Sequence, residues 1–305
     1  MHCGYHRAGL KGLFLGGLSF ILPAVAITLA IAISYEHIQS LRWTDPIISG
    51  IKAAVISFII GAVYKLGKKA IKDVHHWIIG LVVVVAAFYG VNEIILILTA
   101  GLVFLLFRSF VGSAALLSIA PLPLFFLSLS NYTHLKLFLV FLKVGLVLFG
   151  SGYVLFAYLD GELIDGLSWL SHETLVEAIA VGQMTPGPVL STATFIGYKV
   201  GGLGGALLAT VGIFLPSFFY VWGLNRFIHK FRSNQKLKFF LEAVNVAAVS
   251  VMLVVCVKMG QSIIIDWRTG LICLLSFGLY FGFRGLSTLW IIVLGAVMGY
   301  ALSFL

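Results

Sequence analysis

The six residues from Gln183 to Pro188 offer the side chains and backbone groups best suited to bind a small ligand. They read Gln-Met-Thr-Pro-Gly-Pro and interrupt an otherwise apolar stretch. Proline ends a helix that precedes it, yet it is favoured at the first position of a new helix. With Thr185 as N-cap and Pro186 as the first helical residue, this break predicts the start of a half-helix.

The start of a half-helix is chemically suited to an anion. Its first N–H groups have no partner within the helix, and the helix dipole places partial positive charge there. Pro186 and Pro188 have no N–H and cannot donate. The predicted donors are the remaining backbone N–H groups and the hydroxyls of the break, which belong to Gly187, Val189, Leu190, Thr185, Ser191 and Thr192. The alternative is a kink that serves packing alone.

A second interruption, Gly150-Ser151-Gly152-Tyr153, precedes the first. It would face the Gln183–Pro188 break and contribute to the same site. Small residues also let two helices cross closely without any ligand, so a purely structural role is the alternative. Gln183 has two interpretations as well, because its amide would either donate to the anion or hydrogen-bond a neighbouring helix.

Two polar residues, Lys52 and Asn245, lie inside long apolar segments, where they are costly in a bilayer, and a third, Glu177, lies on the short helix that leads into the break. Lys52 would supply positive charge to an anion, or extend its amine to the membrane surface. Asn245 aligns with Lys52 in the internal repeat described below. Glu177 would take up a proton as the anion leaves, or belong to a solvated helix face with Glu173.

Motifs of catalysis are missing from the sequence. It contains none of the patterns typical of metalloproteases, nucleophile elbows or phosphate-binding loops. Cys3, Cys256 and Cys273 are too widely spaced to indicate a metal site. We therefore expect no enzyme activity, no cofactor and no bound metal.

The elements that hold these residues are predicted to lie in a lipid bilayer. Hydrophobic residues make up 61% of the 305 residues and charged residues only 10%, with a mean hydropathy of +1.09. A soluble domain carries about 25% charged residues. The net charge of +9 is typical of Lys and Arg in cytoplasmic loops, and no basic face indicates nucleic-acid binding. The composition predicts an all-α polytopic membrane protein.

An internal repeat organises the chain. Residues 4–73 align without a gap with residues 197–266, pairing Gly4 with Gly197, Pro23 with Pro216 and Asp73 with Asp266. Duplication within an apolar chain is typical of secondary transporters.

Apolar runs predict long and short helices in both copies. The long ones are Leu10–Ile33, Ile47–Leu66, Leu135–Leu159, Leu203–Leu224 and Phe239–Val257. The short ones are Trp77–Tyr89, Ile94–Phe107, Glu173–Met184, Pro188–Tyr198, Gly270–Phe281 and Thr288–Phe304. Runs this short are half-helices or tilted hairpins, because about 20 residues are needed to span a bilayer.

Equivalent loops of the two copies carry opposite charge. Tyr35–Pro46 is slightly acidic, whereas its counterpart Arg226–Lys238 is strongly basic. Lys65–Lys72 holds four lysines, whereas Lys258–Arg268 is close to neutral. Basic loops stay on the cytoplasmic side, so the two copies should face opposite ways. The predicted fold is an inverted structural repeat with broken or short half-helices.

Three parts follow from this alignment. Residues 1–108 form the back part of the first repeat, residues 109–134 link the repeats on or in the bilayer, and residues 135–305 form a complete second repeat. The stretch that precedes Gly197 in the second copy has no counterpart before Gly4. We therefore expect the front portion of the first repeat to be missing, through a cut gene, a misassigned start or an expressed fragment.

Several motifs occur here in one order and spacing. They are Phe149-Gly150-Ser151-Gly152-Tyr153, Trp169-Leu170, Gly182 to Pro188, Ala193 to Tyr198, Gly202 to Ala206 and Ala209 to Ser217. This combination resembles the second domain of the chromate ion transporter family over about residues 140–260. Residues 4–73 are similar to the back part of that family's first domain.

The resemblance implies an inner-membrane protein that moves chromate outward by exchange or proton-linked antiport, with sulfate as the look-alike anion. The family's first domain also carries a Phe-Gly-Gly segment and a Pro-Gly-Pro break, and neither precedes Gly4 here. The alternative is therefore an inactive fragment, or half of a split transporter. Its partner would be a second copy in a homodimer or a protein that supplies the front portion.

Overall fold

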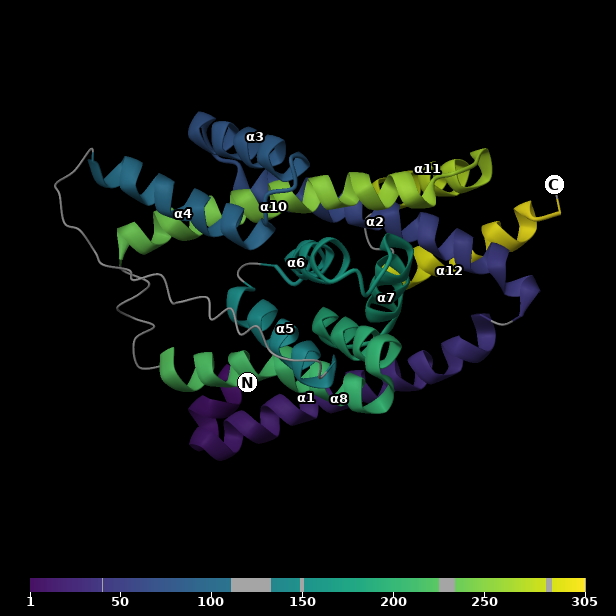
Figure 1. Cartoon of the computed structure of the whole chain (residues 1–305), viewed down its shortest axis with the longest axis horizontal. Coiled ribbons are helices and arrows are strands. Elements are labelled where there is room, and N and C mark those ends of the chain that lie inside the picture. The colour runs from purple at the N-terminus through teal and green to yellow at the C-terminus, as the bar shows by residue number, and fades with distance from the viewer. Residues whose placement is uncertain (40, 111–132, 149–150, 225–233, 284–286, 305) are drawn as a thin grey trace.

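A computed structural model of the chain describes residues 1–39, 41–110, 133–148, 151–224, 234–283 and 287–304 (Figure 1). This part of the chain is helical and contains no strand, which confirms the all-α prediction. In the first half the helices are α1 His2–Gln39, η1 Arg42–Thr44, α2 Asp45–Ala70, α3 Val74–Phe88 and α4 Glu93–Phe110. In the second half they are α5 Thr133–Val147, α6 Val154–Leu159, η2 Asp160–Gly166, α7 His172–Met184, η3 Val189–Ser191, α8 Thr192–Leu224, α10 Gln235–Ile263, α11 Trp267–Gly282 and α12 Thr288–Leu302.

Four helical segments of the described chain are long and apolar enough to cross a membrane. They are α1, α2, α10 and the segment Val189–Gly223, which is mostly α8. Shorter apolar helices, among them α3, α4 and α12, accompany them. The chain is therefore a multi-pass membrane protein, as the composition predicts.

The aligned copies fold alike at their first long helices. α1 is kinked at Ala8 and Gly9, and α8 is kinked at the aligned Gly201 and Gly202. Gly9 and Gly202 have φ values of 56° and 60°. Glycine adopts this left-handed conformation without the steric penalty that other residues pay, so the kink recurs where glycine recurs.

At each kink the chain folds back on itself. A Cβ placed on Gly4 would collide with the carbonyl of Gly12, and one placed on Gly197 would collide with the carbonyl of Gly205. Residues eight apart in a straight helix would be separated by about 12 Å. Each kink therefore makes a short helical hairpin, so the predicted half-helix Pro188–Tyr198 is one arm of a hairpin rather than a separate helix.

The two copies exchange their terminal hairpins. α3 and α4 of the first copy pack on α10 of the second, while α11 and α12 pack on α2. Aligned N-caps begin the exchanged hairpins, Asp73 for α3 and Asp266 for α11. A hydrogen bond with Thr269 lowers the pKa of Asp266 and completes a capping box.

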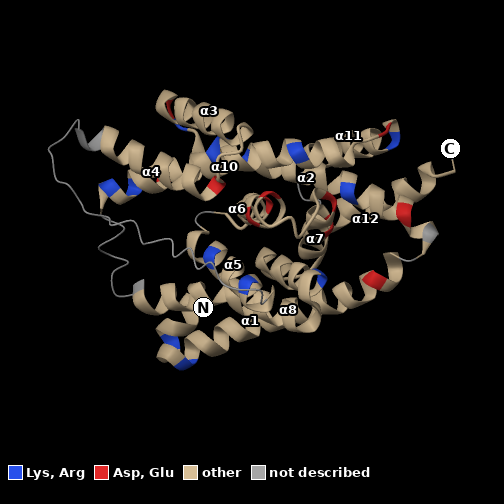
Figure 2. Cartoon of the chain, in the orientation of Figure 1, with Lys and Arg blue, Asp and Glu red and all other residues tan. Residues whose placement is uncertain are grey.

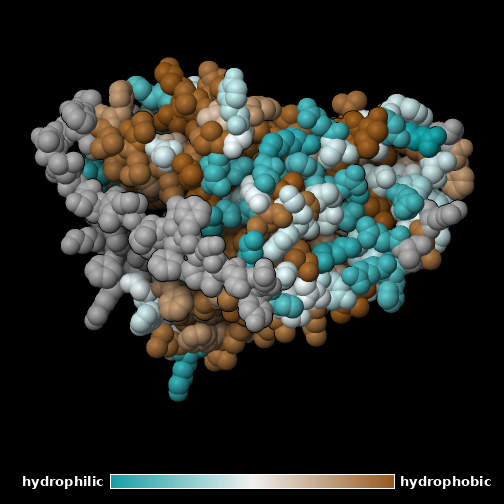
Figure 3. Space-filling view, viewed as in Figure 1, coloured by the Kyte–Doolittle hydropathy of each residue, from teal (hydrophilic) through white to brown (hydrophobic). Residues whose placement is uncertain are grey.

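Two layers enclose a central core. Figure 1 shows α2, α10 and the exchanged hairpins in one layer, α1, α5 and α8 in the other, and α6 and α7 between them. Every residue of α6 is buried. On the viewed face, apolar surface follows the upper and lower layers and hydrophilic surface lies between them, over α6 and α7 (Figure 3). The core that positions the candidate site is therefore built mainly by the second copy.

The aligned long helices run in opposite directions. In Figure 1, α1 ends and α2 begins at one end of the molecule, whereas α8 ends and α10 begins at the other. This is the arrangement that an inverted repeat requires, and the placement of each copy in a bilayer stays a prediction. Most of the basic loop Arg226–Lys238 and most of the predicted linker 109–134 lie outside the described residues. The three-part division of the chain likewise stays a prediction.

Candidate anion-binding site

The Gln183–Pro188 break joins α7 to the hairpin of α8, but its caps differ from the prediction. Thr185 is the C-cap of α7, and its hydroxyl donates to the carbonyl of Val181 at 2.8 Å. The next helical turn starts after Pro188, which occupies its N-cap position. The assignment of Thr185 as N-cap and Pro186 as first helical residue is therefore wrong. A residue before proline is driven to extended backbone, so Thr185 and Gly187 cannot be helical and the helix restarts only after the second proline.

Gly187 packs against the first copy. Its φ is 150°, and an added Cβ would lie 2.5 Å from the Cβ of Ala24 in α1. Thr185 also reaches α1, since its hydroxyl lies 3.2 Å from that of Thr28. These contacts explain both residues by packing, and a role for the Gly187 N–H in binding stays a prediction.

Two buried polar groups at the break have no hydrogen-bond partner among the described residues. They are the hydroxyl of Ser191, which is fully buried, and the amide nitrogen of Gln183. A buried donor without a partner costs about 1–3 kcal/mol. The hydroxyl of Thr192, by contrast, donates to the carbonyl of Val189 at 2.7 Å. Ser191 and Gln183 are thus the side chains at the break that are free to donate to a ligand.

The second interruption meets the first. α5 ends at Val147 and α6 begins at Val154, with Ser151 and Gly152 between them. A Cβ on Gly152 would lie 3.8 Å from the Cβ of Val189, immediately after the proline break. The hydroxyl of Ser151 accepts from the N–H of Tyr153 at 3.4 Å. Gly150 lies outside the described residues.

Lys52 and Glu177, predicted separately, form an ion pair. The Lys52 Nζ lies 2.8 Å from the Glu177 Oε1 and 3.2 Å from the Glu173 Oε2. The side chains of Lys52 and Glu177 are only 14% and 5% exposed. Lys52 is therefore paired rather than free, and Glu177 is buried rather than on a solvated face; the position of Lys52 relative to the membrane surface stays a prediction.

This pair belongs to a polar cluster that sequence reasoning missed. The Gln39 side chain lies 3.5 Å from the Glu177 Oε2, and the Lys199 Nζ lies 3.1 Å from the Gln39 Oε1. Lys199 also lies over the ring of Tyr35. The cluster joins α1, α2, α7 and α8, about 12 Å along α7 from the break by helical rise. Its members come from helices distant in sequence, and only the polar character of Gln39 and Lys199 within apolar surroundings hinted at them.

Asn245 is half-buried in α10, and among the described residues no hydrogen bond joins it to either break. Its role in the site stays a prediction.

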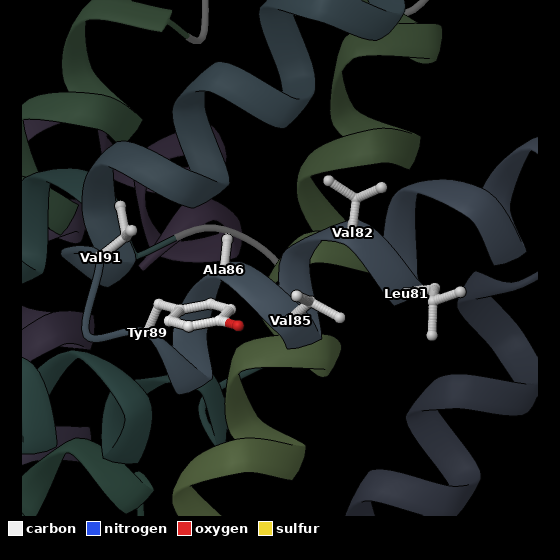
Figure 4. A pocket seen from close by; sticks show the side chains of 6 residues that line it. All are labelled: Leu81, Val82, Val85, Ala86, Tyr89 and Val91. Carbon is white, nitrogen blue, oxygen red and sulfur yellow. The ribbon is translucent and has the colours of Figure 1, made fainter.

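An apolar hollow at the end of α3 has few groups that could bind an anion. Figure 4 shows its lining by Leu81, Val82, Val85, Ala86, Tyr89 and Val91. The hydroxyl of Tyr89 is the one polar side-chain group among these residues, and no cation lines the hollow. Acidic segments lie on α6 and α7, among charged residues on many other helices (Figure 2). The two facing breaks remain the candidate site, with the Lys52–Glu177 pair about 12 Å away along α7.

Comparison with known proteins agrees with the sequence motifs. The chromate transporter profile matches residues 1–105 and 135–300. A chromate transport protein of Cupriavidus metallidurans is 30% identical, over 98% of this chain and 77% of the relative. A probable chromate transport protein of Synechococcus elongatus is 30% identical, over 90% of this chain and 74% of the relative.

An uncharacterised transporter of Methanocaldococcus jannaschii is 26% identical, over 98% of this chain and 79% of the relative. No solved structure matches the chain significantly. The profile covers most of both repeats, and the relatives are transport proteins rather than enzymes. The chain therefore belongs to the chromate transporter family and is a membrane transporter.

Proposed function

We propose that this protein exports chromate across the inner membrane by proton-linked antiport, and that sulfate competes for the same site. The observation that carries the proposal is the meeting of two helix breaks beside buried, unpartnered donors at Ser191 and Gln183. The names of the relatives support chromate as the substrate. Sulfate has the same tetrahedral shape and double charge, so these donors would accept it as well.

A dianion can enter this core only if fixed donors replace its water, because burying an unpaired charge is prohibitive. The N–H groups of Gly187, Val189 and Leu190 would supply backbone donors, with the side chains of Ser191 and Gln183 beside them. The prolines limit which N–H groups point at the ligand. In the described conformation Thr185 and Thr192 already donate to backbone carbonyls. Their proposed role is to hold the break open rather than to donate.

The Lys52–Glu177 pair would couple the anion to a proton. While the anion is bound, Glu177 would stay ionised in its pair with Lys52, at 2.8 Å. As the anion leaves, Lys52 would turn to Glu173, which lies 3.2 Å from its Nζ, and the buried Glu177 carboxylate without a partner would bind a proton. Release of that proton on the other side would restore the pair before the next anion binds. Glu177 is the proposed proton acceptor, and the inverted arrangement of the two copies would expose the site to each side in turn.

Ser191→Ala tests this site without disturbing its packing. Removing an unpartnered hydroxyl should leave folding intact, yet it should weaken chromate binding about tenfold, since a hydrogen bond to a charged group contributes about 1.5–3 kcal/mol. Ser276→Ala is the matched control, because that hydroxyl is also fully buried and unpartnered but lies in α11. The measurement is counterflow of radiolabelled chromate in proteoliposomes, with sulfate as competitor. Equal affinities for both variants and the parental protein would remove the break from the site.

A second candidate, half of a transporter that works with a partner, is favoured by the uncovered face of α1. Phe20 on α1 is 57% exposed, whereas the aligned Ile213 on α8 is fully buried. Ile213 lies where α8 packs against α5. Phe20→Cys should then cross-link to a second copy or to a heavier partner in native membranes, with Ile213→Cys as the inaccessible control. If Phe20→Cys cross-links neither to a second copy nor to another protein, then lipid covers this face of α1.

A further inference from the structure

A cluster of three carboxylates, two of them buried and Asp165 exposed, lies outside the candidate anion site. Carboxylate oxygens of Glu93, Asp160 and Asp165 all lie within 4.8 Å of one another. Asp160 is fully buried and Glu93 nearly so. Glu93 comes from α4, whereas the two aspartates come from η2. The cluster therefore joins the end of the first copy to the front of the second.

The wide helical turn of η2 makes the cluster possible. Asp160–Gly166 is π-helical, with hydrogen bonds from residue i to i+5. This geometry brings Asp160 and Asp165 to one side, whereas an α-helix would separate residues five apart around its axis. Glu93 completes the group by lying directly against Gly161, where an added Cβ would collide with its carboxylate. Any larger residue at this position would have to displace the Glu93 carboxylate from the cluster.

Positive charge near the cluster is scarce. Lys258 of α10 lies 2.8 Å from the Asp165 Oδ2 and 3.6 Å from the Asp160 Oδ2. His172 of α7 places its Nε2 3.1 Å from the Asp160 Oδ1. Lys143 of α5 is paired with Glu162 at 2.6 Å. Within the described part of the chain, Lys258 is therefore the one lysine or arginine that forms ion pairs with the cluster, and it pairs with Asp160 and Asp165 only.

Asp160 is the member of the cluster without adequate partners. Neither of its oxygens has a hydrogen bond within the described residues, and its nearest amine is 3.6 Å away and closer to Asp165. Asp165 is exposed and paired with Lys258, so the two buried carboxylates, Glu93 and Asp160, are left with little positive charge, and like charges this close oppose each other's ionisation. The group that burial penalises most is Asp160.

We propose that Asp160, with Glu93 beside it, is a second proton-binding site of the transporter, filled and emptied through His172. His172 is 26% exposed, so one ring nitrogen can take a proton from water. Its Nε2 lies 3.1 Å from the Asp160 Oδ1 without forming a hydrogen bond, and a rotation of the ring that aligns Nε2–H would pass a proton to Asp160. One proton enters the ring as one leaves it, and no redox change occurs. Conformational change that moves α4 or α10 relative to η2 would shift Glu93 or Lys258 and release the proton. This inference rests on the proposed antiport and adds a proton site to it.

Asp160→Asn tests the inference in proteoliposomes. Chromate–chromate counterflow needs no net proton transfer and should continue at the parental rate. Chromate movement driven by a pH gradient, and proton flux reported by an entrapped pH-sensitive dye, should fall at least about tenfold, the usual size of a coupling effect. Glu162→Gln is the matched control, since that neighbouring carboxylate is paired with Lys143. Undiminished proton flux in Asp160→Asn would overturn the proposal, and so would an equal loss of counterflow and proton-driven movement.

A second measurement does not depend on transport. Infrared difference spectra between acid and alkaline pH should show a carboxylic-acid C=O band that Asp160→Asn removes and Glu162→Gln keeps. A band unchanged in Asp160→Asn would contradict the proton site whatever the substrate. A parental protein without chromate counterflow, but with this band, would contradict the proposed function and leave the proton site standing. Glu93→Gln should shift the frequency of this band. That variant tests the proton site if Asp160→Asn does not fold.

Discussion

The first long helices of the two copies, α1 and α8, share a backbone path but not their surroundings. Both are kinked at aligned glycines and fold back at aligned glycine contacts. α8 is then covered by α5, whereas α1 has no corresponding helix among the described residues. The aligned Phe20 and Ile213 differ accordingly, being 57% and 0% exposed. Local glycine chemistry thus sets the path of a helix, and the elements that come before it in the repeat decide which faces are buried.

The largest expected effect comes from substituting a glycine that the two copies share at their kinked helices. Gly12→Val and Gly205→Val should each abolish folded protein, because an added Cβ would collide with the carbonyl of Gly4 or of Gly197. Overpacking against backbone costs about 3 kcal/mol or more, a large fraction of total stability. Yield of monodisperse protein in detergent measures the effect. Gly223→Val is the control, since nothing lies near a Cβ there. Tolerance at Gly12 alone would mean that the first hairpin is not formed as described.

The second test addresses what the copies do not share. Ile213→Ala should lower the free energy of unfolding by about 2–5 kcal/mol, because it empties a fully buried site. Phe20→Ala removes more atoms but should cost little, since lipid is as apolar as the side chain it replaces. Thermal unfolding in lipid nanodiscs reports both variants. A large loss for Phe20→Ala in the membrane, but not in detergent, would indicate that a partner covers α1.

A third and smaller effect concerns how closely α5 approaches α8. A Cβ on Gly212 would lie 2.7 Å from the carbonyl of Phe138 and 3.1 Å from the N of Leu142. The aligned residue on α1 is Ser19, which is exposed. Gly212→Ser should therefore cost about 1–3 kcal/mol by overpacking, whereas Ser19→Gly should be almost neutral. Helix propensity alone would make Gly212→Ser slightly stabilising and Ser19→Gly slightly destabilising, so a thermal stability that does not fall in Gly212→Ser would contradict the close α5 contact.

The sequence predicted the helices and the repeat well because both depend on local signals. Apolar run length, the aligned glycines and the aligned prolines are all visible along the chain. Thr185 was predicted to be an N-cap but is the C-cap of α7. The effect of each proline on the backbone of the residue before it outweighed the preference of threonine for an N-cap.

The charge clusters could not be predicted, since their members come from different helices. Lys52 meets Glu177 across 125 residues of sequence, and only the packing of α2 against α7 brings them together. Asp160 and Asp165 lie on the same side only because η2 is π-helical. No periodicity in the sequence predicts a π-helix there. Sequence spacing therefore identified chemically able residues, while tertiary packing decided which of them act together.

The smallest expected effect on stability comes from substituting Lys52, and it differs from the effect of substituting the aligned Asn245. This prediction is also the one closest to function. Lys52→Asn makes the first copy resemble the second and leaves Glu177 buried without a counter-charge. The cost should be about 1–2 kcal/mol, less than for a fully buried pair because Lys52 retains some exposure. Adding Glu177→Gln should return most of that loss, since no lone charge then remains, and the double-mutant cycle measures the pair directly. Asn245→Ala should change neither stability nor chromate counterflow. If Lys52→Asn and the double variant were equally unstable, the ion pair would contribute nothing, and the exchange of partners proposed for Lys52 during transport would lose its basis.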